Sequence, residues 1–427
     1  MKSGDRSLES VVVLYLSLFF LVASTLALGP AKSLVGLKFS QILVVSSIIA
    51  LALSYPLRKK MHGSLISSPD TDSNFKSDAL IVILLYSSAL AVLAIRATLE
   101  WSFIPHDEAY HLRFPIRIYE ALDRLDYDTL VSYARVNVNP IFPYLLTVAL
   151  VPYPYFSIFS ARLFAMTTSS LVPIVLYFLV KENGVDYRLS ALTAFALSFS
   201  SLFQSQAYHY TFDGLSTLLF TVAFYFLVKA MRNQKKINLV LSSIFFYLLV
   251  VTKYPPAVWL VLIYIPTTVF LMTKKNWSVN NVLPLIVTIA SSLPLAFCMF
   301  LLSPNIFSRL LVEIFFGWNK LTIPYAVATL WDLVFILGWS PYLIIVFVAY
   351  RYLRSREKNE IIFVSLLAIM LAFLTLVPYL PVTRRIIQAI PVFFATTVSY
   401  SYGRYPSKVV ALILLNLSWW GALTLIT

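Results

Sequence analysis

The residues with the clearest potential for chemistry lie between positions 101 and 140, the longest polar interval of a largely apolar chain. This interval holds six of the 19 acidic residues, and its adjacent acids Asp107 and Glu108 are flanked by His106 and His111. A carboxylate in such a pair can accept the proton of an incoming hydroxyl group. If this stretch is helical, Asp107 and His111 share one face. We therefore predict that this loop carries the reactive groups, with Asp107 as the general base.

Charged side chains also occur at three other places where apolar runs end. His209 and Asp213 lie in SQAYHYTFDGLSTLLF, Lys253 lies in TKYPP, and Arg384 and Arg385 lie in LPVTRRIIQAIP. Ionised groups at a bilayer boundary are costly unless they are paired or hydrated, so their convergence on one surface indicates a site. The cations suit a phosphate group, which arginine can bind through two parallel hydrogen bonds.

These charged residues also have structural interpretations that the sequence leaves open. Asp107 and Glu108 could cap an interfacial helix, and Asp213 could cap the helix that it precedes. Arg384 and Arg385 could anchor the end of a span at lipid headgroups.

A metal site is the alternative interpretation of the histidines. His106, His111 and His209 could bind a metal ion together with the two acids, but their spacing matches no metal-binding motif. The single cysteine, Cys298, lies within an apolar run and offers neither a disulfide nor a cysteine metal site. A metal site at the histidines therefore stays open as the weaker alternative.

The composition indicates a membrane protein, with 59% hydrophobic and 12% charged residues, against roughly 25% charged residues in soluble domains. Polar residues are confined to short intervals between apolar runs of about 20 residues, the length of a transmembrane helix. We predict an all-α polytopic membrane protein of about 13 transmembrane helices. The predicted spans begin near Leu8, Gln41, Ala79, Phe156, Leu189, Asp213, Ile237, Ala257, Asn281, Tyr325, Glu360, Ile386 and Val409.

The basic residues predict the orientation in the membrane. The net charge of +14 comes mostly from short connections at span ends, such as RKKMHG, KENGVDYR and MRNQKK, so membrane topology explains it better than nucleic acid does. Placing these connections inside puts the N-terminus in the cytoplasm, with residues from Leu8 forming a first span rather than a cleaved signal. The acidic loop then lies outside a multi-pass cell (plasma) membrane protein.

The acidic loop itself predicts amphipathic juxtamembrane helices. Pro115 should interrupt the first of them and begin a second. The second has an apolar stripe opposite a charged face and would lie along the membrane interface. The stripe consists of Ile118, Leu122 and Leu125, and the charged face of Arg117, Glu120 and Arg124. The apolar segment 141–151 is too short for a span, so we expect a half-inserted or bent element.

The order of these motifs resembles the GT-C glycosyltransferases, in particular the dolichyl-phosphate-mannose protein mannosyltransferase and aminoarabinose transferase branch. The matching pieces are Asp107-Glu108-Ala109-Tyr110, Asn139-Pro140-Ile141-Phe142-Pro143-Tyr144, Arg162-Leu163, the segment around Asp213, the turn Thr252-Lys253-Tyr254, and RRIIQAIP. Arg384-Arg385 stands where the family has an Arg-Tyr pair, which leaves open which arginine has the family role. The Trp-Trp-Asp-Tyr-Gly motif of oligosaccharyltransferases is missing, so transfer of a preassembled oligosaccharide to asparagine is not expected.

The resemblance implies a membrane glycosyltransferase that moves a sugar, a mannose-type hexose, from a polyprenyl-phosphate or dolichyl-phosphate carrier to a hydroxyl group of a glycan, lipid or protein acceptor. The reaction would take place on the extracytoplasmic face with inversion and without a divalent metal. Asp107, Glu108 and Asp213 would be catalytic, the last two by positioning acceptor or sugar. His111, Tyr110, His209, Lys253, Arg384 and Arg385 would bind substrate.

The resemblance also suggests how the chain is divided. Residues 1–78 would form an N-terminal two-span segment and a cytoplasmic connector. Residues 79–270 would form the catalytic membrane module with its external loop 98–140, and residues 271–427 the helices that complete a groove for the donor lipid. Two other functions stay open, a transporter or lipid flippase with an external acidic gate and a structural membrane subunit. A transporter would carry charges and broken helices at the bilayer midplane.

Overall fold

The computed structural model describes residues 70–99, 106–130, 142–151, 155–273, 279–302, 388, 390–402 and 410. These residues form helices and connections without strands, which confirms the predicted all-α class for this part of the chain. The helices are α3 (Asp70–Leu99), α4 (His106–Asp123), α6 (Phe142–Leu150), α7 (Ile158–Ser169), α8 (Val172–Glu182), α9 (Tyr187–Ser198), α10 (Ser201–Ala207), α11 (Asp213–Asn233), α12 (Lys236–Thr252), α13 (Tyr254–Thr273), α14 (Val279–Leu302) and α20 (Ile390–Ser401).

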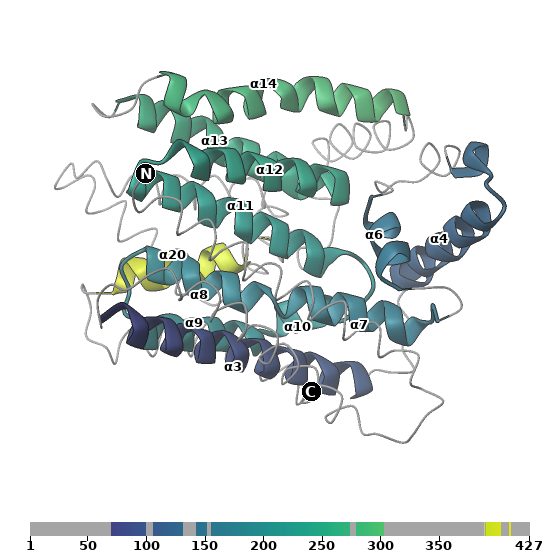
Figure 1. The fold of residues 1–427 in the computed structure, drawn as a ribbon, viewed down its shortest axis with the longest axis horizontal. Coiled ribbons are helices and arrows are strands. Elements are labelled where there is room, and N and C mark those ends of the chain that lie inside the picture. Colours follow the sequence, from purple (N-terminus) through teal and green to yellow (C-terminus); the bar gives the residue numbers. More distant parts are fainter. Residues whose placement is uncertain are drawn as a thin grey trace, which may run out of the picture.

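The long helices lie side by side along one axis, and α4 and α6 cover one end of this bundle (Figure 1). The run of α7 and α8 and the helix α11 form its centre, where most side chains are buried. α3 lies at the edge and exposes Leu80, Leu84 and Ile95. α11 and α12 are antiparallel, joined at Gln234 in the left-handed conformation, so the start of α11 and the end of α12 meet at the same end.

Three segments of the described residues are long and apolar enough to cross a membrane, namely Asp78–Thr98, Ile158–Glu182 and Asp213–Asn233. They match the spans predicted near Ala79, Phe156 and Asp213. α12, α13, α14 and α20 fall on the spans predicted near Ile237, Ala257, Asn281 and Ile386. The spans near Leu8, Gln41, Tyr325 and Glu360, and nearly all of the one near Val409, lie outside the described residues, so the full count stays a prediction.

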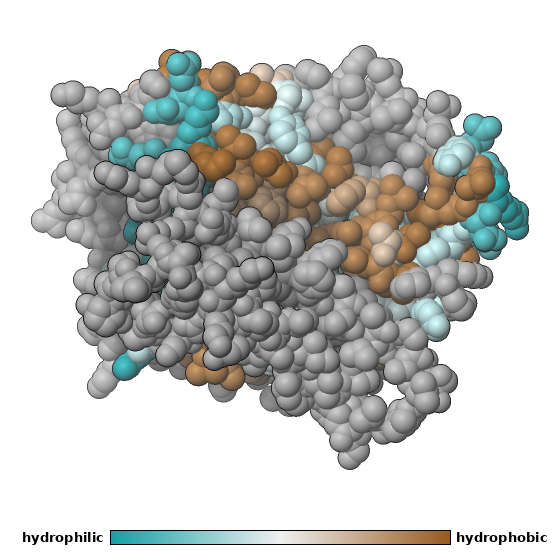
Figure 2. Space-filling view, in the orientation of Figure 1, coloured by the Kyte–Doolittle hydropathy of each residue, from teal (hydrophilic) through white to brown (hydrophobic). Residues whose placement is uncertain are grey.

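The surface supports this membrane interpretation. Among the described side chains, hydrophobic residues form a band between hydrophilic groups toward the two ends of the long axis (Figure 2). The exposed hydrophobic side chains of α12, α13 and α14 include Ile244, Val269 and Val287. Apolar surface of this extent is unfavourable in water, at about 25 cal/mol per Å², and is stable against lipid.

The span predicted near Leu189 is not one continuous helix. α9 ends at Ser198, α10 is a separate short helix, and residues 208–212 are not helical. The break frees backbone groups that lipid could not satisfy. The side chain of Gln204 compensates by donating a hydrogen bond to the Ser198 carbonyl at 2.8 Å. We did not predict this break from the sequence, because an apolar, serine-rich run is compatible with both a continuous and an interrupted helix.

α4 differs from the two helices that we predicted around Pro115. It continues through this proline, which costs one backbone hydrogen bond. Residues on both sides of Pro115 pack into the same core, and this burial stabilises the continuous helix. Only Ile118 of the predicted apolar stripe is buried, because the stripe continues beyond the bundle and leaves Leu122 41% and Leu125 70% exposed. α6 is nine residues long, as expected for an element too short to span.

Gly214 in the first turn of α11 allows α11 to approach α7 closely. A Cβ atom at this position would lie 1.7 Å from Ser169 Oγ and 3.0 Å from Ser169 Cβ. Ser169 Oγ already donates a hydrogen bond to the Ala207 carbonyl at 2.8 Å, so it has little freedom to move. Glycine at this position therefore sets the distance between the two central elements of the bundle.

We expect Gly214→Ala to lower the thermal unfolding temperature of the protein in a mild detergent. Overpacking costs about 1–3 kcal/mol, which exceeds the roughly 0.5–1 kcal/mol that alanine gains over glycine in a helix. The double variant Ser169→Ala/Gly214→Ala removes the nearest clashing atom and should recover part of the loss. An unchanged or higher unfolding temperature for Gly214→Ala alone would contradict the close packing.

Candidate functional site

The site is organised around the carboxylate of Glu108, which is completely buried in the first turn of α4. Arg162 of α7, also completely buried, binds it like a fork. Arg162 Nε donates to Glu108 Oε1 at 3.0 Å and Arg162 Nη2 donates to Oε2 at 2.8 Å. The guanidinium group also lies over the ring of Tyr208, 5.7 Å from its centre. This ion pair fixes α4 on the central helix α7.

The non-helical connector 208–212 supplies the remaining partners of this carboxylate. The backbone N–H of Tyr210 donates to Glu108 Oε1 at 2.9 Å, and His209 Nδ1 lies 3.2 Å from Oε2. Since an ionised carboxylate only accepts hydrogen bonds, Nδ1 carries the proton. The connector ends at Phe212, which adopts the left-handed conformation with φ of 61°. Such a conformation is uncommon outside glycine and is kept here by the contacts on both sides.

These contacts determine the charge of Glu108. Burial alone raises the pKa of a carboxyl group, but the hydrogen bonds from His209, Arg162 and the Tyr210 N–H outweigh it and lower the pKa of Glu108 to about 2. Glu108 is therefore ionised at any physiological pH. Such a carboxylate is a weak base, so the geometry suits it to hold other groups in place rather than to accept a proton.

A second ionic centre lies at the start of α11. The carboxylate of Asp213 is 3% exposed and binds the ammonium group of Lys253, which is 23% exposed and follows the last residue of α12. Gln388 Nε2 donates to Asp213 Oδ1 at 2.9 Å, and Thr211 Oγ1 donates to Oδ2 at 2.9 Å. Lys253 is thus the accessible member of this centre. The connector 208–212 joins it to Glu108.

Aromatic side chains fill the space around the two centres. His111 Nδ1 lies 2.6 Å from the hydroxyl oxygen of Tyr144 on α6, and both side chains pack edge-on against the ring of Phe212. Tyr210 donates its hydroxyl hydrogen to Thr147 of α6 at 2.7 Å. α6 is therefore attached to both α4 and the connector.

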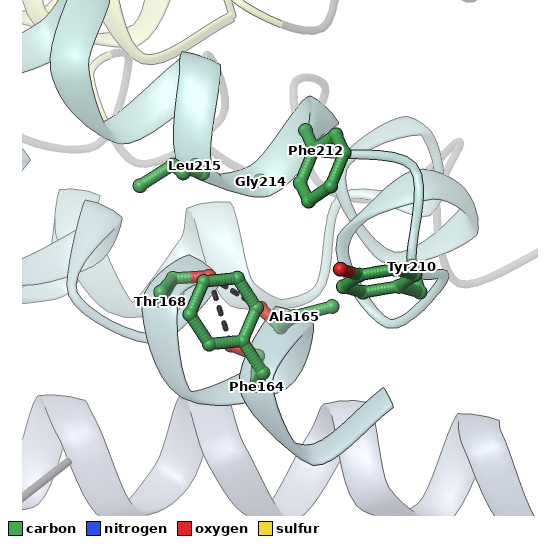
Figure 3. A pocket seen from close by; sticks show the side chains of 7 residues that line it. All are labelled: Phe164, Ala165, Thr168, Tyr210, Phe212, Gly214 and Leu215. Carbon is green, nitrogen blue, oxygen red and sulfur yellow. Dashed lines mark hydrogen bonds between the residues drawn. The ribbon is translucent and has the colours of Figure 1, made fainter. Parts of the chain in front are cut away.

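A narrow apolar crevice lies between the centres, where α7 faces the connector and the start of α11 (Figure 3). Its lining residues are Phe164, Ala165, Thr168, Tyr210, Phe212, Gly214 and Leu215. It leaves no room for a water molecule, and Thr168 directs its hydroxyl group to the carbonyls of its own helix. The crevice is therefore an apolar contact between α7, the connector and α11 rather than a binding cavity.

The structure brings together part of the predicted site. Glu108 and His209 meet at one centre, and Asp213 and Lys253 meet at the other. His111 pairs with Tyr144, and Tyr110 packs on Phe114 with ring centres 4.9 Å apart, so both line the aromatic surroundings instead. Asp107 belongs to the first turn of α4, but its side chain lies outside the described residues, as do Arg384 and Arg385. Their roles stay predictions.

Four hydrogen-bonding partners of the two carboxylates were missing from the predicted site, namely Arg162, the Tyr210 backbone, Thr211 and Gln388. Arg162 could have been chosen, because a charge inside a long apolar run indicates a buried partner. The Tyr210 backbone and Gln388 gave no such signal, since neither carries a charge. For the metal alternative, the described residues contain no group of three or more histidine, cysteine or acidic side chains placed to hold an ion.

Comparison with known families gives a match for the central part of the chain. Residues 141–311 match the family model described as dolichyl-phosphate-mannose-protein mannosyltransferase, a family of the GT-C superfamily. The resemblance predicted from the sequence is thereby confirmed over this segment, which contains Arg162, His209, Asp213 and Lys253 but begins after α4. A search of curated proteins found no match.

We expect Glu108→Gln to destabilise the fold strongly, because it leaves the buried guanidinium group of Arg162 without its counter-charge. Breaking a buried ion pair in this way costs about 3–5 kcal/mol, whereas replacing both partners is often nearly neutral. The double variant Glu108→Gln/Arg162→Met should therefore be more stable than Glu108→Gln alone in thermal unfolding. Additive effects of the two substitutions would show that the pair is not coupled.

The low pKa of Glu108 also predicts a pH dependence of stability. Between pH 4.5, the ordinary pKa of the carboxyl group, and about pH 2, Glu108 is protonated in the unfolded chain but not in the folded chain. The contribution of Glu108 to the free energy of unfolding is therefore complete above pH 4.5 and is lost as the pH falls. It amounts to about 3 kcal/mol. The stability difference between wild type and Glu108→Gln should accordingly shrink below pH 4.5, and a constant difference down to pH 2.5 would refute the assignment.

Proposed function

We propose that this chain, whose residues 141–311 match a protein mannosyltransferase family, is an integral membrane glycosyltransferase that uses a polyprenyl-phosphate sugar as donor. The observation that carries the proposal is the position of Glu108. Residues of the matched segment, namely Arg162, His209 and Tyr210, hold this side chain directly beside Asp107 in the first turn of α4. The acidic loop and the matched segment thus form one site.

Asp107 acts as the general base in this proposal. It accepts the proton of the acceptor hydroxyl group, whose oxygen forms a bond to the anomeric carbon of the sugar. The bond between that carbon and the phosphate oxygen breaks, and the carrier leaves as a polyprenyl phosphate. Direct displacement inverts the configuration at the sugar carbon. The contacts of Glu108 fix the backbone next to Asp107, and this keeps the base in the correct position relative to the bound substrates.

The leaving phosphate gains negative charge and needs cations near it. Lys253 is available on the accessible side of the second centre, and Arg384 and Arg385 precede Gln388 by only four and three residues. We assign these cations to the donor phosphate. Because the donor carries one phosphate and no nucleotide, this reaction runs without a divalent metal or another cofactor.

The charge distribution supports an orientation with the site on the extracytoplasmic face. At the end of the bundle opposite the site, Lys181 binds Asp78 at 2.7 Å. The exposed cations Arg232, Lys235 and Lys236 flank the turn between α11 and α12 at the same end. Clusters of this kind face the cytoplasm. The proposed enzyme is a multi-pass protein of the cell membrane with a cytoplasmic N-terminus.

The substrate classes follow from the family likeness and the chemistry. We propose a mannose-type hexose as the sugar and a hydroxyl group of a protein, lipid or glycan as acceptor. Glu108 and Asp213 are buried, so in this proposal they position the acceptor or the sugar indirectly, through the groups that they hold. Tyr110, His111 and His209 line the same end of the bundle. Nucleic acid is not a partner in this proposal.

The transporter alternative finds less support in the described residues. Two of the predicted spans are broken in the described residues, one between α7 and α8 and one after Ser198. A break of this kind binds an ion through free carbonyl groups. Side chains of the same helix occupy several of those carbonyls, as Thr167 Oγ1 donates to Leu163 and Ser170 Oγ donates to Met166. The buried ion pairs lie at the end of the bundle instead of its middle.

Sugar transfer in membranes that express the full chain tests the proposal. Radiolabelled sugar should move from a polyprenyl-phosphate donor pool to an acceptor with the wild type, and Asp107→Asn should lower the rate by about 10²–10⁴-fold because the base is lost. Asp123→Asn, an exposed acid on the same helix, is the matched control and should keep the wild-type rate. Arg384→Ala with Arg385→Ala should also abolish transfer.

The contrary results are equally clear. Wild-type transfer that survives Asp107→Asn would move the base to another residue. Absence of transfer from every polyprenyl-phosphate sugar, with the protein folded and inserted, would refute the enzyme and favour the transporter.

A further inference from the structure

Gln388 connects the C-terminal part of the chain to the second ionic centre. Its side chain is 2% exposed and donates through Nε2 to Asp213 Oδ1 at 2.9 Å and to Ser216 Oγ at 3.2 Å. Gln388 and Asp213 are 175 residues apart, so the local sequence around either residue does not predict this contact. A neutral amide that binds a buried carboxylate forms a charge-assisted hydrogen bond, which is stronger than a bond between neutral groups.

The carboxylate of Asp213 receives donors from three separate parts of the chain. Lys253 and Gln388 bind Oδ1, and Thr211 binds Oδ2. The carboxylate itself is buried, whereas Lys253 is partly exposed. An ammonium group has three hydrogens, so Lys253 can bind Asp213 on its inner side and an anion on its outer side. Asp213 thus acts as the support that orients this cation.

The pair of Asp213 and Lys253 is neutral as a unit. The pair can therefore orient a phosphate group by hydrogen bonding, but it carries no net charge to attract it. Strong binding of the phosphate needs further cations.

We propose that Gln388 is a positioning residue for the donor phosphate. Through Asp213 it orients the partly exposed ammonium group of Lys253, so that this cation binds the phosphate group on its outer side. This inference rests on the proposed function for the identity of the donor, and it adds a residue and a role that the proposed function does not contain.

Binding of farnesyl phosphate to the purified full chain in detergent tests this role, with farnesol as the uncharged probe. Gln388→Met keeps the size of the side chain and removes its donor, and it should weaken farnesyl phosphate binding about tenfold, as expected when a charge-assisted contact is lost. Farnesol binding should not change. Gln204→Met is the matched control, because Gln204 is equally buried but bonds only the Ser198 carbonyl, and it should bind farnesyl phosphate like the wild type.

A second readout separates positioning from general damage to the fold. In the transfer assay, Gln388→Met should lower kcat/KM for the donor about tenfold with KM for the acceptor nearly unchanged. If Gln388→Met does not fold, Ser216→Ala removes the second acceptor of Gln388 and should weaken farnesyl phosphate binding by about two- to threefold, since the lost bond is between neutral groups.

The outcomes distinguish this inference from the proposed function. If Gln388→Met binds farnesyl phosphate like the wild type, the inference is overturned whether or not sugar is transferred. If Gln388→Met does not fold, wild-type binding by Ser216→Ala overturns it in the same way. Equal loss of farnesol and farnesyl phosphate binding overturns it too, because the phosphate would not be involved. Gln388-dependent binding by a protein that transfers no sugar would refute the glycosyltransferase and leave the phosphate site standing.

Discussion

Burial of the charge on Glu108 is the constraint on which the rest of the site depends. A carboxylate with no access to water must find a counter-charge and enough hydrogen-bond donors, or the fold loses several kcal/mol. Arg162 supplies the charge, and His209 and the Tyr210 N–H complete the donors. The same constraint affects the backbone, since the chain between α10 and α11 is not helical and this conformation directs the Tyr210 N–H to Glu108.

The connector 208–212 is where the two ionic centres become one site. It begins with Tyr208 under the guanidinium group of Arg162 and ends with Phe212, whose left-handed conformation starts α11 at Asp213. Helix geometry then places Gly214 against Ser169, so the same turn that presents Asp213 also sets the packing of α11 on α7. Charge, backbone conformation and packing are satisfied together only in this arrangement.

Composition and periodicity predicted the helical class, the principal spans and the location of the charged residues, because apolar length and charge placement are local properties. The motif order predicted the family that residues 141–311 match. The partners of the charged residues could not be predicted, since the ion pair of Glu108 joins positions 54 residues apart and the Gln388 contact is longer still. Pro115 was misjudged because burial of the residues on both sides of it outweighs its local preference. The break after Ser198 was missed because an apolar, serine-rich run is compatible with either geometry.

The sequence distances within the second centre imply an order of assembly during synthesis. Lys253 follows Asp213 by 40 residues and Gln388 follows it by 175. At roughly 5–20 residues per second, the ribosome makes Lys253 within about 2–8 s of Asp213, but Gln388 only after about 9–35 s. The neutral pair can therefore form while the C-terminal helices are still being translated, which spares the nascent chain an unpaired acid beside the membrane. Gln388 is the last member of this centre to be made, and it binds a pair whose charges are already balanced.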